Sequence, residues 1–252
     1  MLLTAVIITK NEERNIRRCL ESVKDVADEI VVVDSLSTDA TEEICHEYKV
    51  KFVKQEWLGY SGQKNFANNI ASNDWIFSID ADEALSDELK KSLLEIKNKD
   101  FSDATVFSMN RLTNYCGHWI RHCGWYPDSK IRIWNRKIGK WKGDIHETIE
   151  YETSVDIQHL KGDLEHYSYY FLEEHIRQAD KFTTLTALEA FKSGKRCDGI
   201  WKLRVKTTWK FMHDYLFQLG FLDGYYGYIV CKISAFATFM KYSKLHEMTK
   251  KA

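Results

Sequence analysis

The sequence predicts an α/β fold in which parallel strands alternate with helices. Apolar residues dominate three short segments, residues 2–8, 29–34 and 50–53, as is typical of strands that are covered on both faces. Between these segments, apolar side chains recur every three or four residues, which predicts helices. Strands that alternate with helices pair in parallel through right-handed crossovers. The pattern indicates a Rossmann-like nucleotide-binding half-domain.

Length and composition are those of a globular chain with an uneven charge distribution. The 252 residues are 44% hydrophobic and 29% charged, which is enough for one large α/β domain with an appendage. Residues 171–252 hold 14 Lys/Arg against 8 Asp/Glu, a balance of +6, whereas residues 1–170 hold 22 against 29, a balance of −7. The basic end predicts an anionic surface or substrate.

No uncharged apolar run approaches the roughly 18 residues that a membrane-spanning helix needs. The first residues are typical of a strand and not of a signal peptide. We therefore expect a cytoplasmic protein whose six cysteines are reduced. Basic residues are interleaved with aromatic residues near the C-terminus and no nucleic-acid-reading motif is present, so nucleic-acid binding is not expected.

The most informative stretch is WIFSIDADE at residues 75–83, an apolar run followed by three carboxylates. It predicts a buried strand with an acidic end, and on an extended backbone Asp80 and Asp82 would share a face. In open α/β sheets ligands bind at the carboxyl ends of strands, and carboxylate oxygens suit Mg²⁺ or Mn²⁺. The alternative is a solvated acidic turn before a helix that starts after Ser86.

Phosphates need a counter-charge, and no glycine-rich phosphate loop follows the first strands. We therefore expect a metal ion to supply that charge. A helix that begins near Gln63 would place Lys64 at the same ligand edge. The alternative for Lys64 is a solvated helix residue.

From residue 104 onward the pattern changes. Alternation at residues 105–109 and 130–134 predicts antiparallel or mixed strands, and residues 155–164 predict two more short strands. The segment 115–128 is too rich in aromatic residues and glycine for a simple hairpin, and we expect a loop suited to sugar stacking and anion contact. From about residue 170 the spacing predicts helices.

The same loop raises the alternative of a zinc site, because Cys116, His118, His122 and Cys123 form a common ligand set. Their spacing fits no established zinc pattern. We expect a loop with reduced cysteines instead.

Four ordered motifs resemble family 2 of the inverting glycosyltransferases. They are TKNEE at residues 9–13, VDSLSTDAT at 33–41, QKN at 63–65 and DADE at 80–83. The general resemblance covers residues 1–100. Two later motifs, GWYPD at 124–128 and GDIHE at 143–147, resemble the branch that contains the lipopolysaccharide core biosynthesis β-glucosyltransferases.

The resemblance implies a GT-A fold, an α/β architecture with a Rossmann-like nucleotide-binding half, a mixed central sheet and a C-terminal helical extension. Residues 1–168 would form the glycosyltransferase domain. Its nucleotide-sugar-binding half would be residues 1–100 and its acceptor-side half residues 101–168. Residues 169–252 would form a basic, aromatic helical extension.

The resemblance also implies roles on the donor side. Asp34 would contact the base or ribose, Asp80 the ribose, and Asp82 would ligate the Mn²⁺ or Mg²⁺ that bridges the diphosphate. Many family members carry a second acid after the second strand, where this chain has Ser35, so the base atom read there stays open. The other residues that would contact the nucleotide sugar are Thr9, Asn11, Glu12 and Lys64.

Inversion in a single displacement requires a general base for the acceptor hydroxyl, and the metal would stabilise the leaving diphosphate. Glu147 is the first candidate base, Asp144 the second and Glu83 the third. The alternative for Glu147 is a surface or helix-start carboxylate. His146 would orient the base, ligate the metal or simply pack.

The expected reaction is transfer of a hexose, with UDP-glucose as the expected donor, onto a lipid-linked or lipopolysaccharide-core saccharide. Transfer to polyprenyl phosphate and non-catalytic nucleotide-sugar binding are the alternatives. The C-terminal helices would pack as a cap, and one face would contact an anionic membrane or glycolipid. The oligomeric state stays open. The candidate acceptor-side residues are Trp119, Arg121, Trp125, Tyr126 and Asp128.

Overall fold

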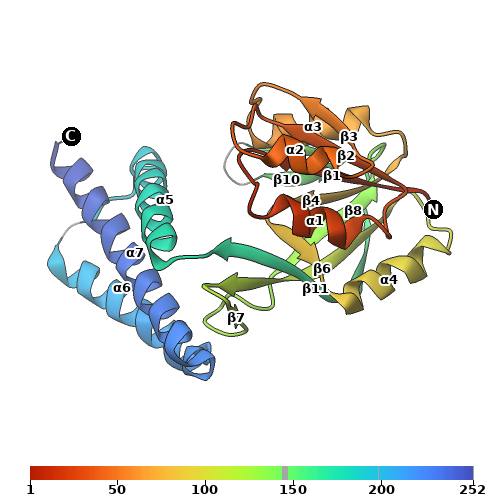
Figure 1. Cartoon of the computed structure of the whole chain (residues 1–252). Helices are drawn as coiled ribbons and strands as arrows, with labels where there is room; N and C mark the ends of the chain where they lie inside the picture. Colours follow the sequence, from red (N-terminus) through yellow and green to blue (C-terminus); the bar gives the residue numbers. More distant parts are fainter. Residues whose placement is uncertain (144–146, 198, 252) are drawn as a thin grey trace. The chain divides into compact units, whose positions relative to one another are not determined.

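A computed structural model describes residues 1–143, 147–197 and 199–251 of the chain (Figure 1). The chain divides into two compact units. The first comprises Met1–Arg111 and Asp128–Tyr167, and the second comprises Leu112–Pro127 and Ser168–Ala252. Residues 112–127, which the sequence places in an acceptor-side half, therefore group with the C-terminal helices.

A mixed sheet forms the centre of the first unit. Its strand order is β3-β2-β1-β4-β8-β6-β11-β5. β1 pairs in parallel with β2 and β4, β2 pairs in parallel with β3, and β4 pairs antiparallel with β8. The expected α/β fold class, with a parallel Rossmann-like half in a mixed sheet, is confirmed. The strands are β1 (Leu3–Thr9), β2 (Glu29–Asp34), β3 (Lys51–Lys54), β4 (Trp75–Asp80), β5 (Glu83–Leu85), β6 (Thr105–Tyr115), β8 (Ser129–Asn135) and β11 (Asp156–Tyr169).

The side chains of β1 alternate between two apolar cores. Ala5 and Ile7 belong to one cluster and Val6 to another, because successive side chains of a strand point to opposite faces. Helix α1 contributes Ile16, Cys19, Leu20 and Val23 to the first cluster, the three- and four-residue spacing of an amphipathic helix. The helices of this unit are α1 (Ile16–Val23), α2 (Thr41–His46), α3 (Tyr60–Ile70) and α4 (Asp87–Lys97).

The start of α4 is as predicted. The Ser86 hydroxyl accepts a hydrogen bond from the backbone N–H of Leu89 at 3.2 Å, which satisfies one of the unpaired donors at the helix start. Capping here fixes where α4 begins, directly after β5 (Glu83–Leu85).

The prediction of two short strands in residues 155–164 is wrong. One strand, β11, runs through them, and it carries Gly162 at φ +90°. A Cβ at Gly162 would lie 2.2 Å from the backbone nitrogen of Leu89, so the glycine marks a close approach of α4 and not a strand end.

A tight hairpin also occurs where none was expected. β7 (His118–Ile120) pairs antiparallel with the end of β6 through Cys116 and Gly117. Both turn residues have positive φ, 51° and 85°, as the tightest hairpin turns require. A second small sheet, of β9 (Gly139–Lys142) and β10 (Thr148–Tyr151), was not predicted either.

The second unit is mainly helical, as predicted from about residue 170. Both α5 (Leu172–Lys192) and α6 (Ile200–Met212) pack against α7 (Gly224–Lys251). A π turn, His213–Phe217, and a 3₁₀ turn, Gly220–Asp223, connect α6 to α7. No helix in the described part of the chain is both long and apolar enough to cross a membrane.

Candidate active site

The strand-end motifs meet at the carboxyl edge of the parallel strands. In the sheet register, Thr9 lies beside Asp34 of β2, and Ile8 lies beside Asp80 of β4. Parallel pairing thus gathers residues that are some seventy positions apart in the chain, because the ends of parallel strands share one edge of a sheet.

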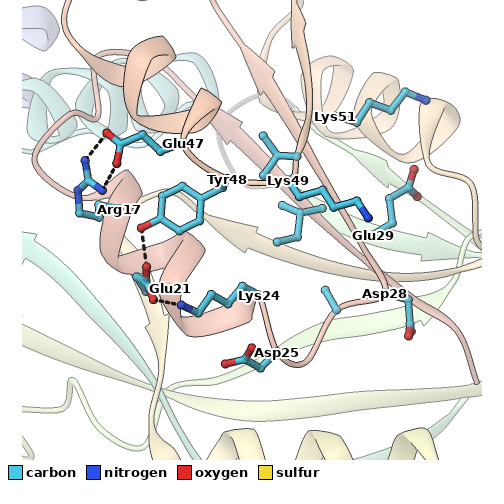
Figure 2. Close-up of a pocket in the computed structure, with 13 residues that line it drawn as sticks. Arg17, Glu21, Lys24, Asp25, Asp28, Glu29, Glu47, Tyr48, Lys49 and Lys51 are labelled. Atoms are coloured by element: carbon cyan, nitrogen blue, oxygen red, sulfur yellow. Dashed lines mark hydrogen bonds and ion pairs between the residues drawn. The ribbon is translucent and has the colours of Figure 1, made fainter.

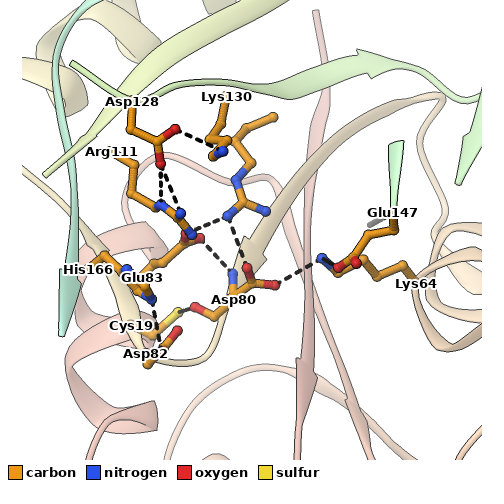
Figure 3. Close-up of polar contacts among 11 residues, drawn as sticks. Cys19, Lys64, Asp80, Asp82, Glu83, Arg111, Asp128, Lys130, Glu147 and His166 are labelled. Atoms are coloured by element: carbon orange, nitrogen blue, oxygen red, sulfur yellow. Dashed lines mark hydrogen bonds and ion pairs between the residues drawn. The ribbon is translucent and has the colours of Figure 1, made fainter. Parts of the chain in front are cut away.

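Asp80 has two cationic partners (Figure 3). Lys64 Nζ lies 3.3 Å from its Oδ1, and Arg132 Nη2 lies 2.9 Å from its Oδ2. Both cationic side chains are 5% exposed. Although burial opposes ionisation, Arg132 and Lys64 hold the pKa of Asp80 well below its usual range. Asp80 is therefore a charge-compensated carboxylate.

Lys64 links Asp80 to the candidate base. Its Nζ also lies 3.1 Å from Glu147 Oε1, on the segment just before β10. The neighbouring Asn65 fixes this geometry, because its side chain exchanges two hydrogen bonds with the backbone of Trp141 in β9, the partner strand of β10. Helix α3 and the small sheet thereby bring Glu147 to the edge where Asp80 lies.

Asp82 has a different environment. Its Oδ2 lies 3.2 Å from His166 Nε2 of β11. Burial and the negative charge of Asp82 raise the pKa of Glu12 to about 7, although a hydrogen bond from Asn15 opposes the shift. Glu12 therefore lies within electrostatic reach of Asp82.

The prediction that Asp80 and Asp82 share one face of an extended backbone is wrong. β4 ends at Asp80, a turn follows at residues 81–82, and β5 begins at Glu83. Figure 3 shows Asp80 directed toward Lys64 and Asp82 toward His166. The turn separates the surroundings of the two carboxylates.

Glu83 lies buried at the end of the turn that follows β4. Its side chain is fully enclosed, pairs with Arg132, and accepts the backbone N–H of Asp80 at 2.9 Å. Burial raises the pKa of Glu83, and the charge of Asp80 adds to the shift, against the opposing charge of Arg132. The third candidate base is therefore shut off from an acceptor.

A second ion-pair group adjoins this network. Arg111 Nη1 lies 3.9 Å from Glu83 Oε1, and its Nη2 lies 2.8 Å from Asp128 Oδ2. Asp128 also pairs with Lys130 at 2.8 Å. Among the candidate acceptor-side residues, Asp128 is the one that belongs to the first unit.

The candidate nucleoside residues connect the ends of β1 and β2. Asp34 is fully buried and accepts the backbone N–H of Ser37 at 2.8 Å. Asn11 has φ 54°, and its Oδ1 accepts the backbone N–H of Thr38 at 2.8 Å. The hydroxyl of Thr9 is buried and has no hydrogen-bond partner within the residues that the structure describes.

The remaining acceptor-side candidates lie in the second unit. Trp119, Arg121, Trp125 and Tyr126 belong to residues 112–127. The Asp223 carboxylate accepts the backbone N–H of Arg121 at 3.1 Å, and the Trp125 ring packs edge-on against Tyr115. Asp144 and His146 lie outside the described residues.

A cavity of about 910 Å³ lies elsewhere, at the amino ends of β2 and β3 (Figure 2). Its charged lining contains two ion pairs: Arg17 contacts Glu47 at 2.6 Å, and Glu21 contacts Lys24 at 2.5 Å. Because ligands of open α/β sheets bind at the carboxyl ends of strands, this cavity is not the candidate site.

The residues around Asp82 fit a divalent cation. A carboxylate and an imidazole are suitable ligands for Mn²⁺, and cations that bind nucleotides use few protein ligands with phosphate oxygens completing the shell. Within residues 1–143, 147–197 and 199–251, no three His, Cys, Asp or Glu side chains are arranged to hold a metal by themselves. Asp82 with His166 would therefore hold the metal together with a diphosphate.

Sequence reasoning missed Arg132 and His166. Arg132 belongs to the charged–apolar alternation of residues 130–134, which did not reveal that its side chain is buried. His166 lies beyond the strands predicted in residues 155–164. The pairing of β11 with β5, His166 beside Glu83, brings it to the turn.

Comparison with known proteins agrees with the motifs. Residues 4–155 match the family described as Glycosyl transferase family 2. An uncharacterised glycosyltransferase of Rickettsia typhi is 32% identical over 259 residues, covering 99% of this chain and 88% of the relative. The lipopolysaccharide core biosynthesis glycosyltransferase LpsC of Rhizobium meliloti is 31% identical over 258 residues, covering 97% and 92%.

A solved structure of S. aureus TarS 1–349 in complex with UDP-GlcNAc aligns with 100% of this chain and 92% of its own, at 16% identity and a TM-score of 0.46. The family match spans more than half of the chain, and the relatives span nearly all of it. The chain belongs to glycosyltransferase family 2.

Proposed function

We propose that the chain transfers a hexose, with UDP-glucose as the expected donor, onto a lipid-linked or lipopolysaccharide-core saccharide with inversion at the anomeric carbon. The observation that carries the proposal is the Lys64 bridge, which brings Glu147 and Asp80 to one sheet edge. A candidate base and a candidate donor-binding carboxylate therefore lie within reach of one ligand. The similarity to LpsC, a lipopolysaccharide core biosynthesis glycosyltransferase, supports the acceptor class.

On the donor side, Asp82 and His166 would hold Mn²⁺ or Mg²⁺ against the diphosphate. When bound, the metal supplies positive charge for the leaving phosphate oxygen. The buried hydroxyl of Thr9 and the carboxylate of Glu12 would contact the nucleoside, and the enclosed Asp34 would support that contact by holding the loop at Ser37. Lys64 adds a fixed positive charge beside Asp80.

On the acceptor side, Glu147 would take the proton from the attacking hydroxyl. The acceptor oxygen forms a bond to the anomeric carbon while the bond to the β-phosphate oxygen breaks, and that oxygen keeps the electron pair. The Glu147 side chain is 20% exposed, which leaves it accessible to a hydroxyl, whereas Glu83 is enclosed. Glu147 therefore remains the first candidate base.

The acceptor would be presented at the inner face of the cytoplasmic membrane, where the basic C-terminal unit would contact anionic headgroups. Transfer to polyprenyl phosphate is the second enzymatic candidate. Its acceptor is also anionic and membrane-bound, so membrane contact fits both candidates. Identifying the acceptor molecule, and not the donor sugar, would distinguish the two.

A donor screen tests the proposal. Purified full-length chain is incubated with UDP- and GDP-sugars with and without Mn²⁺, and released nucleoside diphosphate is measured. We expect metal-dependent hydrolysis of a UDP-hexose. Binding of nucleotide sugars with neither hydrolysis nor transfer to an acceptor would instead indicate a non-catalytic protein.

A further inference from the structure

Helix α6 of the second unit exposes an apolar stripe. Trp201, Val205, Trp209 and Met212 recur at intervals of four, four and three residues, so they lie along one side of α6, and Leu216 follows four residues later in the π turn. No residue of α6 is buried, although the helix packs against α7. The stripe, called the α6 face below, consists of Trp201 (73% exposed), Val205 (63%), Trp209 (59%), Met212 (39%) and Leu216 (42%).

The charges around the α6 face have one sign. Residues 199–213 contain four cationic residues and no Asp or Glu. Among the contacts described, Lys206 donates to the Tyr242 hydroxyl at 2.7 Å, and Arg204 lies over the Trp201 ring at 5.8 Å. Lys210 is the member that pairs with an acid, Asp214, at 3.0 Å. The α6 face is therefore bordered by positive charge that acidic neighbours leave mostly uncompensated.

This combination distinguishes among possible occupants. Trp and Met are enriched in protein–protein interfaces as well as at membranes, so the charges decide between the two: the core of a protein–protein interface is depleted of charged residues, and of lysine in particular. Helices that lie in a membrane interface instead carry Trp and aliphatic residues on one face with Lys and Arg beside them. Anionic headgroups complement the lysines while the tryptophans enter the headgroup region.

We propose that the α6 face docks the chain on an anionic lipid bilayer. Docking would bring the chain to a membrane-bound acceptor, and this purpose of the contact rests on the proposed function. The contact itself depends only on α6 and the lipid.

Vesicle co-sedimentation tests the proposal with the full chain. We expect binding to vesicles of phosphatidylglycerol and phosphatidylcholine, little binding to phosphatidylcholine alone, and weakening with added salt because the headgroup charges are screened. The double variant Trp201→Ser/Trp209→Ser should reduce binding about tenfold or more. The matched control Trp57→Ser removes a tryptophan that is 48% exposed in the first unit and should bind as the wild type does.

Three outcomes would overturn the proposal: no binding of the wild type to anionic vesicles, unchanged binding of the double variant, or a wild-type dimer that forms without lipid and is lost in the double variant. The last outcome would assign the α6 face to a second copy of the chain. Thermal melting of each variant checks that the fold is retained. Donor hydrolysis is measured in parallel, so vesicle binding without hydrolysis would refute the proposed function and leave the docking surface standing.

Discussion

Asp80 and Asp82 are separated by one residue, and their side chains are 31% and 29% exposed, yet their surroundings differ in charge. Asp80 contacts the buried cations Lys64 and Arg132. Asp82 contacts His166, and its negative charge adds to the raised pKa of the nearby Glu12. Similar exposure thus accompanies different partners, two cations for Asp80 and one imidazole for Asp82.

The difference assigns separate roles to the two carboxylates. A carboxylate that two cations already neutralise has little remaining attraction for a metal ion. Among the ion pairs that the structure describes, Asp82 pairs with the His166 imidazole and with no Lys or Arg, so its charge remains available to a cation. We therefore expect Asp80 to position donor and base through Lys64, and Asp82 to bind the metal.

The largest effect should come from Glu147, the residue that Lys64 connects to Asp80. Glu147→Gln keeps an oxygen that can accept from Lys64 but removes the group that takes the proton. We expect kcat to fall by about 10²- to 10⁴-fold, the usual contribution of a general base. Donor affinity, measured by calorimetry, should be nearly unchanged. Normal turnover of this variant would show that another group is the base.

Arg132→Met removes one of the two cations that contact Asp80. It leaves the enclosed Glu83 without its main cation and Asp80 with Lys64 alone. Removing one partner of a buried ion pair costs about 3–5 kcal/mol, so urea denaturation should show a loss of that size.

The surface pair of Arg177 and Glu173 offers a matched control, since the two side chains are 73% and 77% exposed. Arg177→Met should change stability by less than about 1 kcal/mol. Equal losses of unfolding free energy in both variants would mean that the buried Arg132 ion pairs stabilise the fold no more than a surface ion pair does.

A smaller effect follows from Glu12, whose pKa is raised from 4.5 to about 7 by burial and by Asp82. The folded state then binds this proton more tightly than the unfolded chain. The stability of the wild type relative to Glu12→Gln should therefore fall as pH rises from about 4.5 to about 7, by an amount on the order of 2 kcal/mol, and stay constant above.

Denaturation of both proteins at pH 5 and pH 8 measures this difference. In an Asp82→Asn background the fall should be smaller, because one negative neighbour is gone. A difference that rises with pH would contradict the assignment of charge around Asp82.

Much of the first half of the fold could be predicted from sequence, because its signals are local. The apolar runs of β1, β2 and β4 and the cap at Ser86 depend on neighbouring residues. The strand across residues 155–164 was misjudged because Gly162 marks a contact with α4, which no local pattern reveals.

The partners in the site could not be predicted because they depend on pairing between distant segments. Antiparallel pairing of β4 with β8 places Ile133 beside Phe77, which brings Arg132 near the end of β4. Pairing of β11 with β5 similarly brings His166 to Asp82. The sequence motifs indicated which carboxylates lie at the sheet edge. Only the register between distant strands shows which carboxylate has cationic partners.

Calorimetric titration of UDP into the full chain, with Mn²⁺ and then with a chelator, tests the division of roles most directly. Outer-sphere partners of metal ligands are themselves worth about 10- to 100-fold in metal affinity, so a direct ligand should be worth at least about as much. We predict that Mn²⁺ tightens UDP binding by about tenfold or more in the wild type and that Asp82→Asn abolishes this gain. The same Mn²⁺ gain in Asp82→Asn, or none in the wild type, would contradict the account.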